Sequence, residues 1–167
     1  MRPETCSGKE NPSFLGRRQE HISCNASVSL TFSPVADNEK AGLLIFQNED
    51  HYYFLCKSVK NDIPCVQLYK GNELIASNIS GKKNKIFLRI EAHETYYSFF
   101  YASKEGEWKL LKDNLDASFL STKTAGGFVG CLFAMYATSL GKPSVSYADY
   151  DWFEYSGSDK VYKSAKP

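Results

Sequence analysis

The most regular pattern in the chain lies at residues 22–33, where apolar and polar side chains alternate almost without error. The apolar positions are Ile22, Cys24, Ala26, Val28, Leu30 and Phe32. Because successive side chains of a strand point to opposite faces, this period of two predicts a strand with one face in a core and one in solvent. Residues 41–47 (AGLLIFQ) are almost wholly apolar, which predicts a strand buried on both faces.

Short apolar or alternating stretches recur along the rest of the chain, separated by turn residues such as Gly71-Asn72. They span residues 52–59, 65–70, 73–76, 86–92, 96–102, 108–111, 128–136 and 144–155. The whole series amounts to about nine short strands at regular spacing. Residues 115–121 suggest one short turn of helix. The pattern predicts an all-β fold, a two-sheet antiparallel β-sandwich of the jelly-roll type.

The composition of the chain limits the kinds of binding partner that such a fold could have. The 167 residues suit a single domain. Lys and Arg number 20 and Asp and Glu number 19, so a net charge of +1 gives no electrostatic case for nucleic acid or an anionic membrane. The chain shows no membrane-spanning apolar run and no signal peptide. The 11 Tyr, 11 Phe and 2 Trp fit both an all-β core and a carbohydrate partner.

The five cysteines are an odd number and include no C-x-x-C pair, which argues against a disulfide framework or a zinc site. We expect buried free thiols, and a bacterial cytoplasm or periplasm rather than a disulfide-rich extracellular setting. No cofactor is expected. A structural calcium ion at Asp37, Asn38 and Glu39 is the alternative, although three side chains fall short of the about six to eight oxygens that calcium takes.

The closing stretch YADYDWFEYSG carries three carboxylates, Asp149, Asp151 and Glu154, in the pattern D-x-D-x-x-E. Retaining glycosidases use two carboxyl groups about 5–5.5 Å apart, so this trio is a candidate active site. On a regular strand Asp149 and Asp151 share one face, and Glu154 joins them only if a β-bulge turns it round. We therefore expect polar residues on a last strand, with Trp152 or Phe153 packed inward, and keep a jelly-roll endoglucanase as an alternative.

Several longer stretches resemble one known family in its own order. They are FLGRRQEH (14–21), AGLLIFQNEDHYY (41–53), LRIE (88–91), YYSFFYASKEGEW (96–108), AGGFVGCLFAMYATS (125–139) and DWFEY (151–155). Together they resemble the C-terminal concanavalin-A-like β-sandwich of family-43 glycoside hydrolases, the β-xylosidases and α-L-arabinofuranosidases. The resemblance implies a sandwich at residues 14–157, a lead-in at 1–13 with a truncated first strand, and a polar tail at 158–167.

The resemblance also implies that the catalytic residues and the residue that caps the substrate pocket lie in different domains. In this family the catalytic acids lie on a preceding five-bladed β-propeller, so no catalytic residue is expected in this chain. The sandwich packs against the propeller, and a loop aromatic reaches the rim of the substrate pocket. That aromatic corresponds to Phe128, with Gly127 and Gly126 giving its backbone freedom. The implied partners are the propeller, a xylo-oligosaccharide or arabinoside substrate and further copies of the enzyme in a homo-oligomer.

A free-standing carbohydrate-binding module is an alternative of a different class. Jelly rolls bind glycans on concave faces lined by aromatic rings and amides. The rings that could form such a face here are Tyr52, Tyr53, Tyr97, Phe99 and Tyr101. Binding of xylan fragments by the chain alone would distinguish this alternative from an accessory role.

Overall fold

The computed structural model describes residues 1–127 and 130–158. Within these ranges the chain forms eleven strands and two short helical segments. The strands are β1 (Ser13–Arg18), β2 (Ser23–Phe32), β3 (Lys40–Asn48), β4 (His51–Lys60), β5 (Ile63–Lys70), β6 (Glu73–Ile79), β7 (Lys85–His93), β8 (Tyr96–Ala102), β9 (Lys109–Asp116), β10 (Leu132–Thr138) and β11 (Ala148–Ser158). The helical segments are the 3₁₀ turn η1 (Ala117–Leu120) and α1 (Thr122–Ala125). In these ranges no helix has the length and apolarity to cross a membrane.

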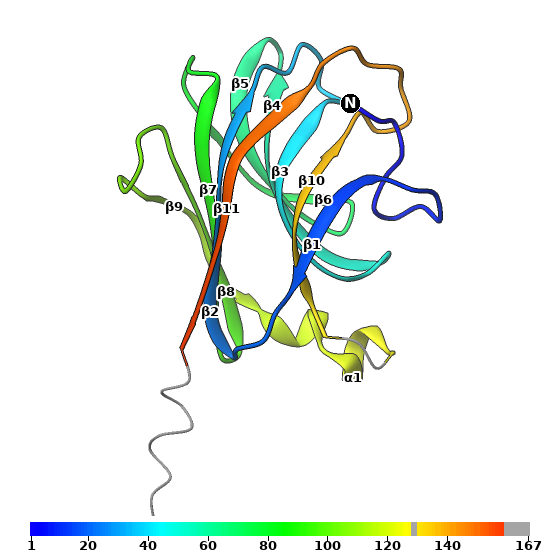
Figure 1. Cartoon of the computed structure of the whole chain (residues 1–167), viewed down its shortest axis with the longest axis vertical. Coiled ribbons are helices and arrows are strands. Elements are labelled where there is room, and N and C mark those ends of the chain that lie inside the picture. The colour runs from blue at the N-terminus through cyan, green and yellow to red at the C-terminus, as the bar shows by residue number, and fades with distance from the viewer. Residues whose placement is uncertain (128–129, 159–167) are drawn as a thin grey trace, which may run out of the picture.

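The strands form two sheets that lie face to face (Figure 1). The six-stranded sheet has the order β1-β10-β3-β4-β5-β6, and the five-stranded sheet has the order β11-β2-β7-β8-β9. Every pair of neighbours is antiparallel. The predicted all-β, two-sheet sandwich is therefore confirmed.

The core lies between the sheets and follows the alternation in the sequence. Val28 and Leu30 of β2 face it and are fully buried, as the pattern at residues 22–33 predicts. On β3, Leu43 and Ile45 point into this core, while Leu44 belongs to a second buried cluster on the outer face of the six-stranded sheet. The prediction of a strand buried on both faces is confirmed.

The second cluster exists because the lead-in covers the outer face of the six-stranded sheet. The backbone N–H of Cys6 donates to the Tyr136 hydroxyl at 2.9 Å. The Met1 amino group donates to the Ser146 carbonyl at 2.6 Å, and the Ser139 N–H donates to the Arg2 carbonyl at 3.0 Å. The residues before β1 are thus attached along their length to the sandwich.

Some boundaries differ from the predicted ones. The strand expected at 128–136 corresponds to β10, which begins at Leu132; residues 128–129 lie outside the described part, and Gly130 and Cys131 are not in a strand. The strand expected at 144–155 begins at Ala148. Strand β1 has no clear period of two, and only the family resemblance pointed to it. The turn of helix predicted at 115–121 is present as η1, and α1 follows it.

The aromatic face proposed for sugar binding does not form from the five predicted rings. Tyr53, Tyr97, Phe99 and Tyr101 point into the main core, where their exposed fractions are between 0% and 6%. They occupy positions on β4 and β8 that face the opposite sheet, so packing in the core takes their ring surface. Tyr52 alone lies on the outer face, and it is 5% exposed.

Candidate functional site

Residues 117–127, the first part of the connection between β9 and β10, lie across one end of the sandwich, where η1 and α1 are found (Figure 1). Phe119 anchors it, with its ring centroid 5.4 Å from that of Tyr53 and 5.0 Å from that of His51. The Lys70 ammonium lies 4.4 Å from the centroid of the same ring, a cation–π contact. The Tyr53 hydroxyl donates to the Asp116 carbonyl at 3.2 Å. The first half of the connection is therefore held on the core.

Side chains cap both helical segments of the connection. The Asp116 carboxylate accepts from the Ser118 hydroxyl at 2.5 Å and from the Ser118 N–H at 2.8 Å, which caps η1, and these two hydrogen bonds lower the pKa of Asp116. The Ser121 hydroxyl caps α1 by accepting from the Thr124 N–H at 3.3 Å. Short polar side chains at these two positions explain why so short a segment folds into two successive turns.

Two side-chain amides from the end of β3 hold the second half of the connection. Gln47, which is 5% exposed, donates from Nε2 to the Gly126 carbonyl at 3.0 Å. Asn48 donates from Nδ2 to the Ala125 carbonyl at 2.9 Å. Its Oδ1 accepts from the His51 N–H at 2.9 Å, which also fixes the turn between β3 and β4. Residues far apart in the sequence thus set the position of Ala125 and Gly126.

The two glycines that follow α1 have backbone conformations that favour glycine. Gly126 has φ of 76° and Gly127 has φ of 75°, a left-handed conformation in which other residues are strained. Both are exposed, and no atom lies within 4 Å of a Cβ built on Gly126. Backbone conformation, not space, is what requires glycine here. Phe128, the predicted capping residue, lies outside the described residues and directly follows this held pair.

The three carboxylates of the closing strand lie together on the outer face of the five-stranded sheet. The register of β11 against β2 shifts between Tyr150 and Trp152, so a bulge absorbs Asp151. Phe153 consequently packs on the core, and Glu154 faces outward with Asp149. On a regular strand Glu154 would lie on the face opposite to Asp149 and Asp151. The bulge instead brings it to the same face.

This arrangement does not have the electrostatics of an acid/base pair. The Lys85 ammonium lies 2.7 Å from Asp151 Oδ2, and the Ser29 hydroxyl donates to the same oxygen at 2.9 Å. These contacts lower the pKa of Asp151, whereas a general acid needs a raised pKa. Asp149 and Glu154 are exposed. One of Trp152 and Phe153 was expected to pack inward. Phe153 does so, and the Trp152 ring lies 6.1 Å from the Phe87 ring on the outer face.

The loop suggested for calcium uses its oxygens within the protein. Glu39 is 3% exposed, and its carboxylate accepts from the Ser144 hydroxyl at 2.6 Å, the Val35 N–H at 2.8 Å and the Ser146 hydroxyl at 3.0 Å. Asn38 turns toward the Ser139 carbonyl. Residues 1–127 and 130–158 contain no group of three or more His, Cys, Asp or Glu that could hold a metal ion. The carboxylate of Glu39 is therefore already engaged by the protein and is a poor candidate for a calcium ligand.

Sequence reasoning missed the two amides that hold the β9–β10 connection. Gln47 and Asn48 stand inside the motif AGLLIFQNEDHYY, so the resemblance marked the stretch. Periodicity treated Gln47 as the polar end of a strand, and nothing in the local pattern indicates a partner about 80 positions away.

The fold and the held loop define a class of domain, an antiparallel concanavalin-A-like β-sandwich with a connection fixed across one end. The family described as "Beta xylosidase C-terminal Concanavalin A-like domain" matches residues 1–156 of the chain. The chain belongs to this family.

Individual relatives agree with this assignment. A xylosidase/arabinosidase of Butyrivibrio fibrisolvens is 35% identical over 156 residues, which cover 92% of this chain and 30% of the relative. A solved structure titled "Bacteroides ovatus Xyloglucan PUL GH43B" superposes with a TM-score of 0.81 at 28% identity, over 87% of this chain and 29% of that one. BlXynB, a GH43 protein of Bacillus licheniformis, gives a TM-score of 0.83 at 23% identity, over 92% and 31% of the respective chains, which supports the fold alone. The chain thus spans about a third of the length of the relatives it matches.

Proposed function

We propose that the chain is a non-catalytic accessory domain of a family-43-like β-xylosidase or α-L-arabinofuranosidase. Its partner is the catalytic β-propeller of the parent enzyme, which hydrolyses glycosidic bonds of xylo-oligosaccharides or arabinosides. The sandwich braces that propeller and shapes the mouth of its substrate pocket through Phe128. An aromatic ring there forms an apolar wall that keeps water from one side of the terminal sugar.

The observation that carries this proposal is the construction of the β9–β10 connection. Gln47 and Asn48 fix the carbonyls of Gly126 and Ala125, and Gly126 and Gly127 both have positive φ angles directly before Phe128 in the sequence. Residues that follow such a support are presented to a partner at little further cost in conformational entropy. The family match and the one-third coverage of larger glycosidases fit the same role.

Reconstitution with a separately produced catalytic domain tests the proposal. The propeller of the Butyrivibrio fibrisolvens relative is a suitable partner because that relative is 35% identical over the matched region. We expect the 167-residue chain alone to release no sugar from aryl-xylosides, and its addition to raise the activity of the propeller. The Phe128→Ala chain should restore less activity, by about tenfold, because a wall of the subsite loses most of its apolar contact.

A matched control separates capping from a general loss of aromatic surface. Tyr147 is 74% exposed in the connection between β10 and β11, at the opposite end of the sandwich from α1 (Figure 1). Tyr147→Ala should restore activity as well as the unchanged chain does. Equal restoration by the Phe128→Ala chain would refute the capping role. Sugar release by the lone chain, abolished by Glu154→Gln, would instead favour the endoglucanase alternative.

A further inference from the structure

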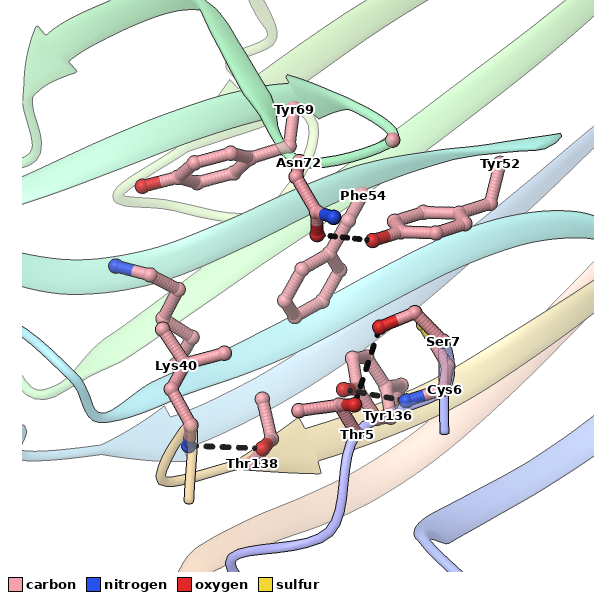
Figure 2. A pocket seen from close by; sticks show the side chains of 12 residues that line it. Thr5, Cys6, Ser7, Lys40, Tyr52, Phe54, Tyr69, Asn72, Tyr136 and Thr138 are labelled. Atoms are coloured by element: carbon pink, nitrogen blue, oxygen red, sulfur yellow. Dashed lines mark hydrogen bonds between the residues drawn. The ribbon is translucent and has the colours of Figure 1, made fainter. Parts of the chain in front are cut away.

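A second candidate site lies on the outer face of the six-stranded sheet, away from the β9–β10 connection. It is a pocket of about 100 Å³ between the lead-in and strands β3, β4, β5 and β10 (Figure 2). Tyr52, Phe54, Tyr69 and Tyr136 contribute aromatic rings, and Asn72 closes the pocket from the β5–β6 turn. One water needs about 10–15 Å³ of such space, so the pocket has room for a ligand larger than a few waters.

The aromatic walls are held in place by the sheet. The rings of Phe54 and Tyr136 pack against each other with centroids 4.7 Å apart. Tyr69 is more open than these two, and its hydroxyl donates to Gln67 Oε1 at 2.9 Å, which fixes the ring. Flat rings in fixed positions suit the apolar face of a sugar ring, which stacks on them without ordering flexible side chains.

The polar groups at the mouth have hydrogen-bonding capacity to spare. The Tyr52 hydroxyl donates to Asn72 Oδ1 at 2.9 Å, which orients the amide and leaves its Nδ2 protons for a ligand (Figure 2). Across the pocket, the hydroxyls of Thr5 and Ser7 lie 3.1 Å apart, and either can donate. Hydroxyl and amide groups opposite an aromatic wall are the usual means of binding a polyol.

The ammonium group of Lys40 at the pocket already has hydrogen-bond partners within the protein. Lys40 is 6% exposed, and its ammonium group donates to the Asp37 carbonyl at 2.8 Å, Gln67 Oε1 at 3.1 Å and the Ser58 hydroxyl at 3.3 Å. An ammonium group has three N–H donors, so none remains for an anionic ligand. The groups left to face a ligand are neutral.

We propose that this pocket binds a single neutral sugar ring of a saccharide, stacked on Tyr69 and hydrogen-bonded by Asn72. The sugar class, a pentose unit of a xylo-oligosaccharide, rests on the proposed function, whereas the pocket does not. The site would let the accessory domain hold substrate at a distance from the capping loop. It also replaces the predicted aromatic face, of which only Tyr52 is retained.

An NMR titration of the 167-residue chain with xylobiose tests the proposal. We expect saturable shifts of the backbone amides of Gly71, Asn72 and Thr138, with a dissociation constant of about 1 mM or lower. Tyr69→Ala should weaken binding about tenfold, and Tyr69→Phe, which keeps the ring, should stay within about twofold. Asn72→Ala changes an exposed turn residue, so it should fold normally and weaken binding about fivefold.

A control variant and a control ligand separate the possible outcomes of the titration. Tyr96 is 39% exposed on the other sheet, so Tyr96→Ala should bind xylobiose unchanged. No saturable shift at about ten times the expected dissociation constant, or equal binding by Tyr69→Ala and Asn72→Ala, would overturn the site. Tighter binding of glucuronic acid than of xylose would overturn its preference for neutral sugars. The titration measures binding by the 167-residue chain alone, whereas reconstitution measures sugar release by the propeller, so failure of this site and failure of the accessory role are separate results.

Discussion

Replacing Asn48 by Asp tests whether the amides of β3 hold the capping connection. The two side chains have the same shape, and Asp keeps the oxygen that accepts from the His51 N–H at 2.9 Å and the Asp50 N–H at 3.1 Å. The substitution changes only the other terminal atom of the side chain, the amide nitrogen Nδ2, which becomes an oxygen. Where Nδ2 donates to the Ala125 carbonyl at 2.9 Å, the variant places a carboxylate oxygen against a carbonyl oxygen. The β3–β4 turn should therefore survive while the connection is released.

The magnitude follows from the bonds that are lost. One hydrogen bond to a carbonyl is worth about 1 kcal/mol net, and the new oxygen–oxygen contact adds repulsion. Gln47→Met keeps the length of that buried side chain but removes its donor to the Gly126 carbonyl, which costs about the same. Combined, the two changes should destabilise the connection by about 2 kcal/mol, which is about a thirtyfold rise in its open population.

Amide hydrogen exchange measures this opening residue by residue. The Ala125 N–H donates to the Ser121 carbonyl at 2.8 Å, and the Gly126 N–H donates to the Thr122 carbonyl at 2.9 Å, so both report on α1. We expect their exchange to quicken about fivefold in Gln47→Met and about thirtyfold in the double variant. Protection within about twofold of the unchanged protein in the double variant would refute the reasoning. Reconstituted activity should fall in the same order.

Three further predictions concern the sandwich itself. Gly42→Ala should destabilise the fold by more than about 3 kcal/mol in urea unfolding, because the new Cβ would lie 2.1 Å from the Leu55 carbonyl oxygen on the neighbouring strand. A loss below about 1 kcal/mol would show that β3 and β4 can separate. Burial lowers the pKa of Lys57 to about 8 from its ordinary 10.5, so the folded protein releases this proton first. The free energy of unfolding of the unchanged protein, relative to that of Lys57→Met, should accordingly rise as the pH goes from about 8 to about 10.5. A difference that does not change over this range would contradict the prediction. All five cysteines are free, and burial raises the pKa of each thiol, so Ellman's reagent at pH about 8 should react with them slowly in the native protein and rapidly in denaturant.

The fold class could be predicted from the sequence because alternation reports burial directly. The strand at residues 96–102 was predicted with the bounds of β8, because Tyr97, Phe99 and Tyr101 alternate along it and face the core. Strand β1 carries the exposed charges Arg17 and Arg18 at its end, so its period of two is weak and the residues alone do not mark it. The start of β10 was predicted too early because the apolar residues before it look like strand.

The two candidate sites depend on contacts that periodicity does not contain. Asn48 reaches Ala125 across 77 positions, and Cys6 reaches Tyr136 across 130. The lead-in forms one wall of the pocket on the outer face of the six-stranded sheet, yet its residues before β1 have no repeating pattern. Only tertiary packing brings such segments to the outer face of a sheet, and a local pattern can mark the participants without pairing them.

The bulge at Asp151 is the feature that a closer physical reading of the sequence can explain. Tyr150 faces the core, so strict alternation would carry Glu154 inward and leave Phe153 outside. An unpaired carboxylate in the core costs far more than the irregular pairing of one residue. One inserted residue instead packs the partly buried rings of Phe153 and Tyr155 against the core, each worth at most about 1.5–3 kcal/mol, and returns Glu154 to solvent. The common face of the three acids is therefore a consequence of packing two aromatic rings, and it needs no catalytic purpose.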